Sequence, residues 1–276
     1  MVPVFTLKNE VRMPALGMGT FPLNGIELSE LVVQALQMGY ELFDTSAAYG
    51  NESSLGQGLL LSRKPRSSFF LTSKVCNRDQ YENRVEEALD QTLKQLRTDY
   101  LDLYLIHWPV PGLFQKTWLT LVEMQKQGKV RAIGVANFHP HHLEELARIS
   151  DVVPAVDQVE LHPLLSQQPL REYCRERGIQ LEAYSPVARM HEKLILHPGW
   201  EALKKRYGKT VPQLILRWDF QHEVIAIPKA SSPARLRENL DIFDFELSEE
   251  DMAVIDGMNC NFRVRYDPDH CDMTKL

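Results

Sequence analysis

The chain has 276 residues, of which 44% are hydrophobic and 25% are charged, and its net charge is −6. This composition excludes a disordered chain, and the acidic balance argues against nucleic-acid binding as the main activity. We find no signal-peptide pattern and no apolar run of the roughly 18 residues that a membrane span needs, so we expect a protein without a membrane segment. The length is close to the roughly 250 residues typical of one (β/α)₈ barrel.

The four cysteines are scattered along the chain and form no CxxC pair. They are Cys76, Cys174, Cys260 and Cys271. Such a pattern indicates free thiols in a reducing compartment, not a disulfide framework or a zinc site. We therefore expect a cytoplasmic protein.

Strand-like and helix-like segments alternate along the chain after a predicted β-hairpin over residues 4–14. The predicted strands are 15–20, 42–43 leading into Asp44, 69–73, 101–106, 130–136, 155–160, 179–185 and 224–229. The predicted helices are 29–38 with Ser29 as its cap, one after Glu52, 81–96, 114–126, 167–177 and 199–222, the last broken near 208–212. The alternation predicts a parallel sheet with helical crossovers.

Eight such units in a chain of this length, with no linker between them, favour a closed barrel over a doubly wound sheet. We therefore predict an α/β fold, a single (β/α)₈ TIM barrel with an N-terminal β-hairpin, over residues 1–276. In such barrels the side chains at the carboxyl ends of the strands line the active face.

Four polar residues stand at or just beyond the ends of three successive predicted strands. Asp44 and Tyr49 follow the second strand, Lys74 ends the third, and His107 ends the fourth. Asp44 and Tyr49 alone are compatible with a helix cap and a surface tyrosine. Ionisable groups at several strand ends, however, carry a desolvation cost unless they bind one another or a ligand. A functional site is therefore the better interpretation.

These four residues suit proton transfer to a carbonyl oxygen. The pKa of a free tyrosine is about 10, and we expect the ammonium of Lys74 to lower that of Tyr49. Asp44 would keep Lys74 protonated, and a neutral His107 would orient the carbonyl. Such a set protonates an alkoxide as it forms, and a nicotinamide cofactor is the natural source of hydride.

Other catalytic patterns are missing. No GxSxG nucleophile elbow is present. His139, His141 and His142 fall at a predicted helix start, and we expect this run to be solvated and to bind no metal.

Seven motifs together resemble the aldo-keto reductase family, from the hairpin to about Asn259. They are DTSAAYGNE at 44–52, the strand-ending Lys74, LIHWP at 105–109, KVRAIGVANF at 129–138, QVELHP at 158–163, AYSPV at 183–187 and IPKASSPARLRENL at 227–240. The short loop after His107 is similar to that of compact bacterial and protozoan members, such as 2,5-diketo-gluconate reductases and prostaglandin F synthases.

The resemblance implies an NADPH-dependent enzyme that reduces aldehydes and ketones, with Asp44, Tyr49, Lys74 and His107 as a catalytic tetrad and Tyr49 as its acid. It implies a monomer with a small-molecule carbonyl substrate. For the cofactor it implies that Asn137 and Gln158 bind the nicotinamide carboxamide, that Tyr184 stacks on the nicotinamide ring, and that Ser185 and Val187 contact the pyrophosphate. It implies that Lys229 and Arg235, with Ser231 beside them, hold the 2′-phosphate, and that Glu238 and Asn239 lie near the adenine. The implied substrate residues are Phe21, Tyr49, His107 and Trp108.

Several of these roles have alternatives. Two cations, Lys229 and Arg235, near a helix start suit the 2′-phosphate of NADPH, although Arg235 is also compatible with a solvated helix face. Phe21 and Trp108 are also compatible with core positions. The tail after Asn259 carries Arg263, Arg265 and His270, which either attract an anionic substrate or form a solvated end.

The chain also departs from the family pattern. Ala136 and Ala230 stand where the family usually has serine, so we expect weaker NADPH binding or better tolerance of NADH. Glu41 and Ser46 stand where arginine and alanine are common. A second function, a cofactor-binding regulatory module that acts through a partner, stays open beside the enzyme.

Overall fold

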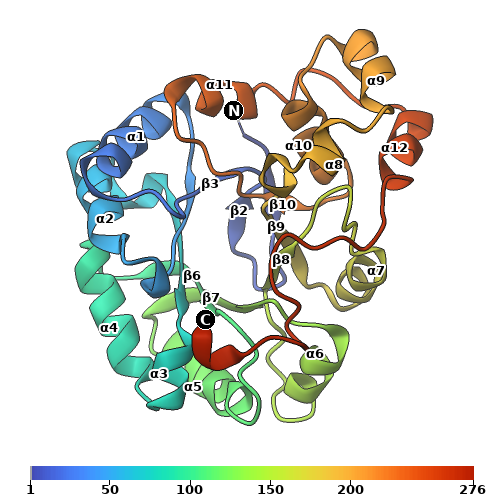
Figure 1. Ribbon diagram of the computed structural model, residues 1–276. Coiled ribbons are helices and arrows are strands. Elements are labelled where there is room, and N and C mark those ends of the chain that lie inside the picture. The colour runs from blue at the N-terminus through green and yellow to red at the C-terminus, as the bar shows by residue number, and fades with distance from the viewer. Residues whose placement is uncertain (1) are drawn as a thin grey trace.

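A ring of eight parallel strands forms the centre of the computed structural model, which describes residues 2–276 (Figure 1). Each strand pairs with its neighbour in chain order. The strands are β3 (Gly17–Gly19), β4 (Leu42–Asp44), β5 (Phe70–Val75), β6 (Leu101–Ile106), β7 (Val130–Ala136), β8 (Val156–Glu160), β9 (Gln180–Tyr184) and β10 (Ile225–Ala226). A parallel bridge between Leu16 and Ala226 brings the first and last strands together. The predicted barrel is confirmed.

The predicted hairpin is also confirmed, and it closes the amino-terminal end of the barrel. Strands β1 (Val4–Thr6) and β2 (Arg12–Pro14) pair antiparallel. Leu7, Val11 and Met13 of this hairpin belong to the same buried apolar cluster as the strand residues that fill the barrel interior. The hairpin therefore fills the amino-terminal end of the barrel interior, so a ligand is expected to bind at the carboxyl ends of the strands.

Helices cover the outside of the barrel. They are α1 (Gly25–Met38), α2 (Glu52–Leu61), α3 (Asn77–Tyr81), α4 (Val85–Leu96), α5 (Phe114–Lys126), α6 (Pro140–Ala147), α7 (Gln168–Arg177), α8 (Glu192–Ile195), α9 (Trp200–Tyr207), α10 (Val211–Gln221), α11 (Pro233–Leu240) and α12 (Glu249–Asp256). Four 3₁₀ turns supplement them: η1 (Ala47–Tyr49), η2 (Arg66–Ser68), η3 (Ala188–Met190) and η4 (Met273–Lys275).

Two helix boundaries differ from the sequence prediction. Helix α1 begins at Gly25 with Asn24 as its cap, whereas Ser29 lies buried inside the helix and donates to the carbonyl of Ser54 at 2.8 Å. The predicted helix 81–96 is two helices, α3 and α4, because Asn83 adopts a left-handed conformation with φ 53°. A left-handed residue interrupts the helical hydrogen-bond ladder.

The carboxyl-terminal tail after α12 crosses the barrel mouth and ends near α3 (Figure 1, red). The buried carboxylate of Glu160, at the end of β8, accepts the backbone N–H groups of Val264 at 2.6 Å and Arg265 at 2.9 Å. Asn77 of α3 donates to the carbonyl of Met273 at 3.0 Å. The tail is thus fixed to the face on which the strand ends meet.

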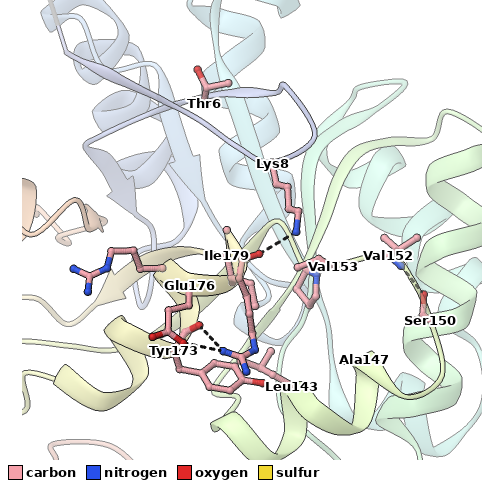
Figure 2. A pocket seen from close by; sticks show the side chains of 14 residues that line it. Thr6, Lys8, Leu143, Ala147, Ser150, Val152, Val153, Tyr173, Glu176 and Ile179 are labelled. Atoms are coloured by element: carbon pink, nitrogen blue, oxygen red, sulfur yellow. Dashed lines mark hydrogen bonds and ion pairs between the residues drawn. The ribbon is translucent and has the colours of Figure 1, made fainter.

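A surface cavity lies at the opposite end of the molecule, between the hairpin, α6 and α7 (Figure 2). Lys8 and Tyr173 line it, and Lys8 donates across it to the carbonyl of Arg177 at 3.1 Å. None of the predicted site residues borders this cavity. Within residues 2–276, no helix combines the length and the hydropathy that crossing a membrane would require.

Candidate active site

A buried ion pair lies at the carboxyl ends of β4 and β5. The ammonium of Lys74 donates to both carboxylate oxygens of Asp44 at 2.7 Å and to the carbonyl of Thr45 at 2.8 Å. Asp44 is 2% exposed and Lys74 is fully buried. Because the ammonium has three N–H donors and all three are used, the cation is held in one orientation.

Tyr49 and His107 flank this ion pair. The Lys74 ammonium lies 5.2 Å from the centroid of the Tyr49 ring. The ring of His107 meets that of Tyr49 edge-on, with 5.7 Å between centroids. The structure therefore brings all four predicted catalytic residues together, from β4, η1, β5 and the end of β6.

Burial sets the protonation of this group. It raises the pKa of Tyr49 above its ordinary value of 10.0, although the charge of Lys74 acts to lower it. Lys74 therefore acts on this pKa in the expected direction, but the loss of solvation outweighs the nearby charge. For Lys74, burial acts to lower the pKa, but the charge of Asp44 raises it above its usual value. At neutral pH the site holds a phenol beside an ammonium.

Ser46 fixes the orientation of the His107 ring. Its Oγ lies 3.1 Å from Nδ1 of His107 and also accepts the backbone N–H of Ala48 at 3.3 Å. The hydroxyl still has its proton and a second lone pair, so it donates to Nδ1 or accepts from it according to the tautomer of His107. Burial, with Lys74 and Arg265 adding to it, holds the pKa of His107 well below its ordinary value. His107 is therefore a neutral N–H donor.

Gln158 joins the ion pair to a second buried acid. Its amide donates to Asp44 and to Glu182, each at 2.7 Å. Burial, and then the charge of Asp44, raises the pKa of Glu182 to about 8, so this carboxyl is largely protonated at neutral pH. Both amide hydrogens of Gln158 are used, and only its carbonyl oxygen is left for a ligand.

The predicted nicotinamide residues meet at the ends of β7 and β9. Tyr184 donates to the side-chain oxygen of Asn137 at 2.7 Å, and the Asn137 amide donates to the carbonyl of His107 at 2.9 Å. Asn137 is in the left-handed region, with φ 65°, which turns its side chain back over the strand ends.

The loop after Tyr184 has an unusual backbone. Ser185, Ala188, Arg189 and Met190 all have positive φ values between 44° and 59°. Non-glycine residues rarely adopt this conformation, and such runs occur where the backbone is shaped for a ligand. The predicted pyrophosphate residues Ser185 and Val187 belong to this loop.

The predicted 2′-phosphate residues surround the start of α11. Lys229, Ser231 and Arg235 are exposed, and Arg235 donates to Ser231 at 3.4 Å. Across residues 2–276, neither cation pairs with an acidic side chain. Cations at the positive end of a helix dipole are poorly placed without an anion. Ala230, beside them, is fully buried.

The two predicted adenine residues lie further along α11 and already have protein partners. Glu238 accepts from the hydroxyl of Thr210 at 2.7 Å, and Asn239 is buried next to Tyr40.

The two predicted substrate aromatics differ in exposure. Phe21 is 45% exposed and its ring lies 5.1 Å from that of Tyr49. Trp108 is 5% exposed, with its ring 6.3 Å from that of His107. Phe21 is therefore free to cover a ligand above Tyr49, while Trp108 forms part of the wall behind His107.

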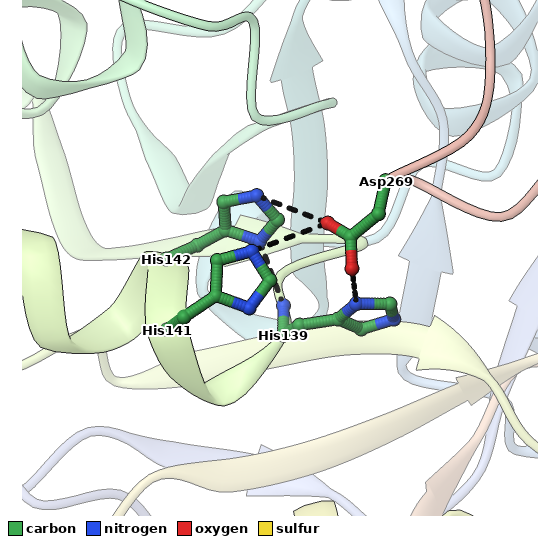
Figure 3. A group of neighbouring side chains, drawn as sticks. All are labelled: His139, His141, His142 and Asp269. Atoms are coloured by element: carbon green, nitrogen blue, oxygen red, sulfur yellow. Dashed lines mark hydrogen bonds and ion pairs between the residues drawn. The ribbon is translucent and has the colours of Figure 1, made fainter.

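The sequence predicts that the histidine run at the start of α6 is solvated. The structure shows instead that part of this run is buried and in contact with the tail. His142 is buried, and Asp269 of the tail forms close contacts with His139, His141 and His142 (Figure 3). The cause is the tail, whose course across the barrel mouth could not be read from local sequence patterns.

Sequence reasoning missed Ser46 and Glu182 as members of the site. Ser46 was noticed only as an unusual residue, and Glu182 lies inside a strand whose period of two predicts only that its side chain faces the same way as Tyr184.

A parallel barrel with a buried ion pair, a phenol and a neutral imidazole at the carboxyl ends of its strands has the architecture of a TIM-barrel enzyme. Comparison with known proteins agrees. The model described as "Aldo/keto reductase family" matches residues 15–259. The glyoxal reductase of Bacillus subtilis is 47% identical over 95% of this chain and 95% of its own. The 9,11-endoperoxide prostaglandin H2 reductase of Trypanosoma cruzi is 42% identical over 96% and 94%.

A solved aldo-keto reductase of Bombyx mori, in complex with NADP, is 31% identical and superposes with a TM-score of 0.90 over 98% of this chain and 96% of its own. The chain belongs to the aldo/keto reductase family. The predicted family is thus confirmed, including the likeness to bacterial and protozoan members, and with it the class of the protein, an oxidoreductase.

Proposed function

We propose that this protein reduces aldehydes and ketones to alcohols with NADPH, and that Tyr49 is the general acid. The observation that carries the proposal is the ion pair of Asp44 and Lys74 beside a neutral phenol and a neutral imidazole. These are the groups needed to polarise a carbonyl and protonate the oxygen that becomes an alkoxide.

The residues present fit NADPH. Lys229 and Arg235 are unpaired cations at the start of α11, and a dianionic phosphate supplies the missing counter-charge. The free carbonyl oxygen of Gln158 and the amide of Asn137 suit a carboxamide. When bound, NADPH supplies the hydride that the carbonyl carbon receives.

The side chains of the site divide the remaining work. Tyr49 holds the proton for the carbonyl oxygen, and burial keeps that proton in place until negative charge develops on the substrate. The ammonium of Lys74 then stabilises the tyrosinate that is left. His107, with its proton on Nε2, orients the carbonyl, and Ser46 holds that tautomer. Phe21 and Trp108 shape the substrate pocket around these groups.

The proposed substrate pocket has a polar base, formed by Tyr49 and His107, and aromatic walls, formed by Phe21 and Trp108. Such a pocket suits a small carbonyl compound with an apolar body. The relative named glyoxal reductase makes glyoxal and similar dicarbonyls the first compounds to test.

We propose that the enzyme is a cytoplasmic monomer. All four cysteines are free thiols, which suits a reducing compartment. Light scattering on the purified protein tests the oligomeric state, and a dimer mass would contradict this part of the proposal.

The decisive experiment follows the loss of NADPH absorbance with glyoxal and a panel of small aldehydes and ketones, in parallel with NADPH binding measured by fluorescence. The enzyme predicts turnover of several panel members. Tight NADPH binding without turnover on any of them would instead support the regulatory module.

A further inference from the structure

Three imidazoles and one carboxylate converge outside the active site, between the start of α6 and the tail (Figure 3). Asp269 Oδ2 lies 2.7 Å from His139 Nδ1, and Asp269 Oδ1 lies 3.2 Å from His141 Nε2 and 3.5 Å from His142 Nε2. One ligand atom from each of the four residues lies within 4.8 Å of those of the others. Such a group has the composition of a zinc-type site.

The spacing fits a metal ion with small rearrangement. Zinc bonds to nitrogen and oxygen measure about 2.0–2.2 Å, which makes the edges of a tetrahedron about 3.3–3.6 Å long. The distances from Asp269 to His141 and His142 already lie close to this range. The contact between Asp269 and His139 must lengthen, and any two ligand atoms that lie near the 4.8 Å limit must move closer together.

Two of the imidazoles have other hydrogen bonds that a metal ion must replace. His142 Nδ1 accepts the backbone N–H of His139 at 3.1 Å, and Nη2 of Arg263 lies 3.2 Å from His139 Nε2. Arg263 also contacts Asp267 at 3.4 Å and can keep that partner when it turns away from His139. If Nε2 of His142 binds a metal ion, the proton of its neutral ring must sit on Nδ1, which then no longer accepts the N–H of His139 at the cap of α6. We therefore rank His142 as the weakest ligand of the four.

We propose that His139, His141 and Asp269 bind a divalent transition-metal ion of the zinc type, with His142 as a fourth, weaker ligand. Nitrogen-rich donors favour zinc, cobalt, nickel or copper over magnesium and calcium, which prefer oxygen. His141 is half exposed, which gives an ion access from solvent.

The site would tie the tail to α6. The same tail is held at the barrel mouth by Glu160, through the N–H groups of Val264 and Arg265. The positive charge of Arg265 acts to lower the pKa of both Tyr49 and His107. A metal bound at Asp269 therefore fixes the segment that carries Arg265 over the active site.

The test adds ZnCl₂ to the chelator-treated full-length protein and measures binding by calorimetry and unfolding by thermal melting. We expect one ion per chain and a rise in melting temperature of about 5 °C or more at saturation. Co²⁺ in place of zinc is expected to give the intense visible absorption of a tetrahedral ion with nitrogen ligands.

Substitutions locate the ion. His141→Gln and Asp269→Asn are expected to abolish the cobalt absorption and the zinc-induced stabilisation, and His142→Gln to weaken zinc binding less. His270→Gln is the matched control, because His270 is an exposed tail histidine that pairs with Asp267 and lies outside the cluster. Zinc binding that survives both His141→Gln and Asp269→Asn overturns the proposal, as does the absence of stoichiometric binding in the wild type.

Discussion

Asp44 and Asp102 are both buried acids paired with cations, but they lie at opposite ends of the barrel. Asp102, near the amino end of β6, accepts from Arg66 and Arg131, each at 2.7 Å, and from the backbone N–H of Leu71 at 2.9 Å. Asp44, at the carboxyl end of β4, accepts from Lys74 and Gln158.

The difference lies in what surrounds each pair. The cations of Asp102 are partly exposed, and the cluster joins η2, β5, β6 and β7. The cation of Asp44 is fully buried and faces Tyr49, beside His107. The same ion-pair physics therefore stabilises strands at one end and adjusts proton donors at the other. The second arrangement suits catalysis because there the ion pair adjoins Tyr49 and His107, which can donate a proton or a hydrogen bond to a ligand.

Asp44→Asn is expected to cause the largest change in this comparison. Removing the carboxylate leaves the buried ammonium of Lys74 without its main counter-charge, so the largest influence that opposes the lowering of its pKa by burial is lost. We expect kcat/KM to fall about 10²-fold and the free energy of unfolding to fall by about 3–5 kcal/mol. Carbonyl reduction and urea unfolding measure the two effects, and full activity in the folded variant would contradict the role of the pair.

Asp102→Asn is the matched control at the other end of the barrel. Arg66 and Arg131 are partly exposed and can turn to solvent, so we expect a loss of about 1–3 kcal/mol in unfolding free energy. Activity per folded molecule is expected to match the wild type. A drop in kcat/KM comparable to that of Asp44→Asn would show that the two ends are not functionally separate.

Arg235→Gln tests the cofactor end of the site. One charge-assisted hydrogen bond contributes about 1.5–3 kcal/mol, so the KM for NADPH is expected to rise roughly tenfold or more. The KM for NADH, which lacks the 2′-phosphate, is expected to stay constant. Arg237→Gln, on the same helix, serves as control. Equal effects on NADPH and NADH would remove Arg235 from the phosphate site.

Ser46→Ala is expected to have a smaller effect, because it removes one neutral hydrogen bond from His107. We expect kcat/KM to fall roughly two- to tenfold, while the KM for NADPH is unchanged. Ser46→Thr, which keeps the hydroxyl, is the control. Identical losses in both variants would indicate a packing effect instead of control of the tautomer.

The pH dependence of kcat/KM is expected to be flat over a wide range. Burial raises the pKa of Tyr49 above 10.0 and holds that of His107 well below 6.5. Tyr49 thus loses its proton only at alkaline pH, and His107 gains one only at acidic pH. A titration of kcat/KM with a midpoint between these two values would mean that another group, such as Glu182 with its pKa of about 8, or an altered tyrosine controls the reaction.

The sequence predicted the regular parts of this molecule well. The strands at 101–106 and 130–136 agree with β6 and β7, because apolar runs between helices have no other stable place than a covered sheet. The predicted strands 15–20 and 224–229 are longer than the observed strands β3 and β10, because strand length in a barrel depends on pairing between distant segments. The clustering of Asp44, Tyr49, Lys74 and His107 was predictable because each of them stands at or just beyond a strand end.

Long-range contacts were not predictable in this way. Ser46 contacts His107, Gln158 bridges Asp44 and Glu182, and Asp269 meets the histidines of α6 only because the barrel and its tail bring them together. The raised net pKa of Tyr49 was not predictable either, because burial, which opposes the effect of Lys74, is a property of the folded chain.

The most direct test of the central claim compares Tyr49→Phe with the wild type in NADPH-dependent reduction of an aldehyde. The phenyl ring keeps the packing against Phe21 and removes only the hydroxyl. We predict that kcat/KM falls by about 10² or more, while NADPH binding and the unfolding midpoint stay unchanged. A variant that reduces the aldehyde as fast as the wild type would contradict the assignment of Tyr49 as the general acid.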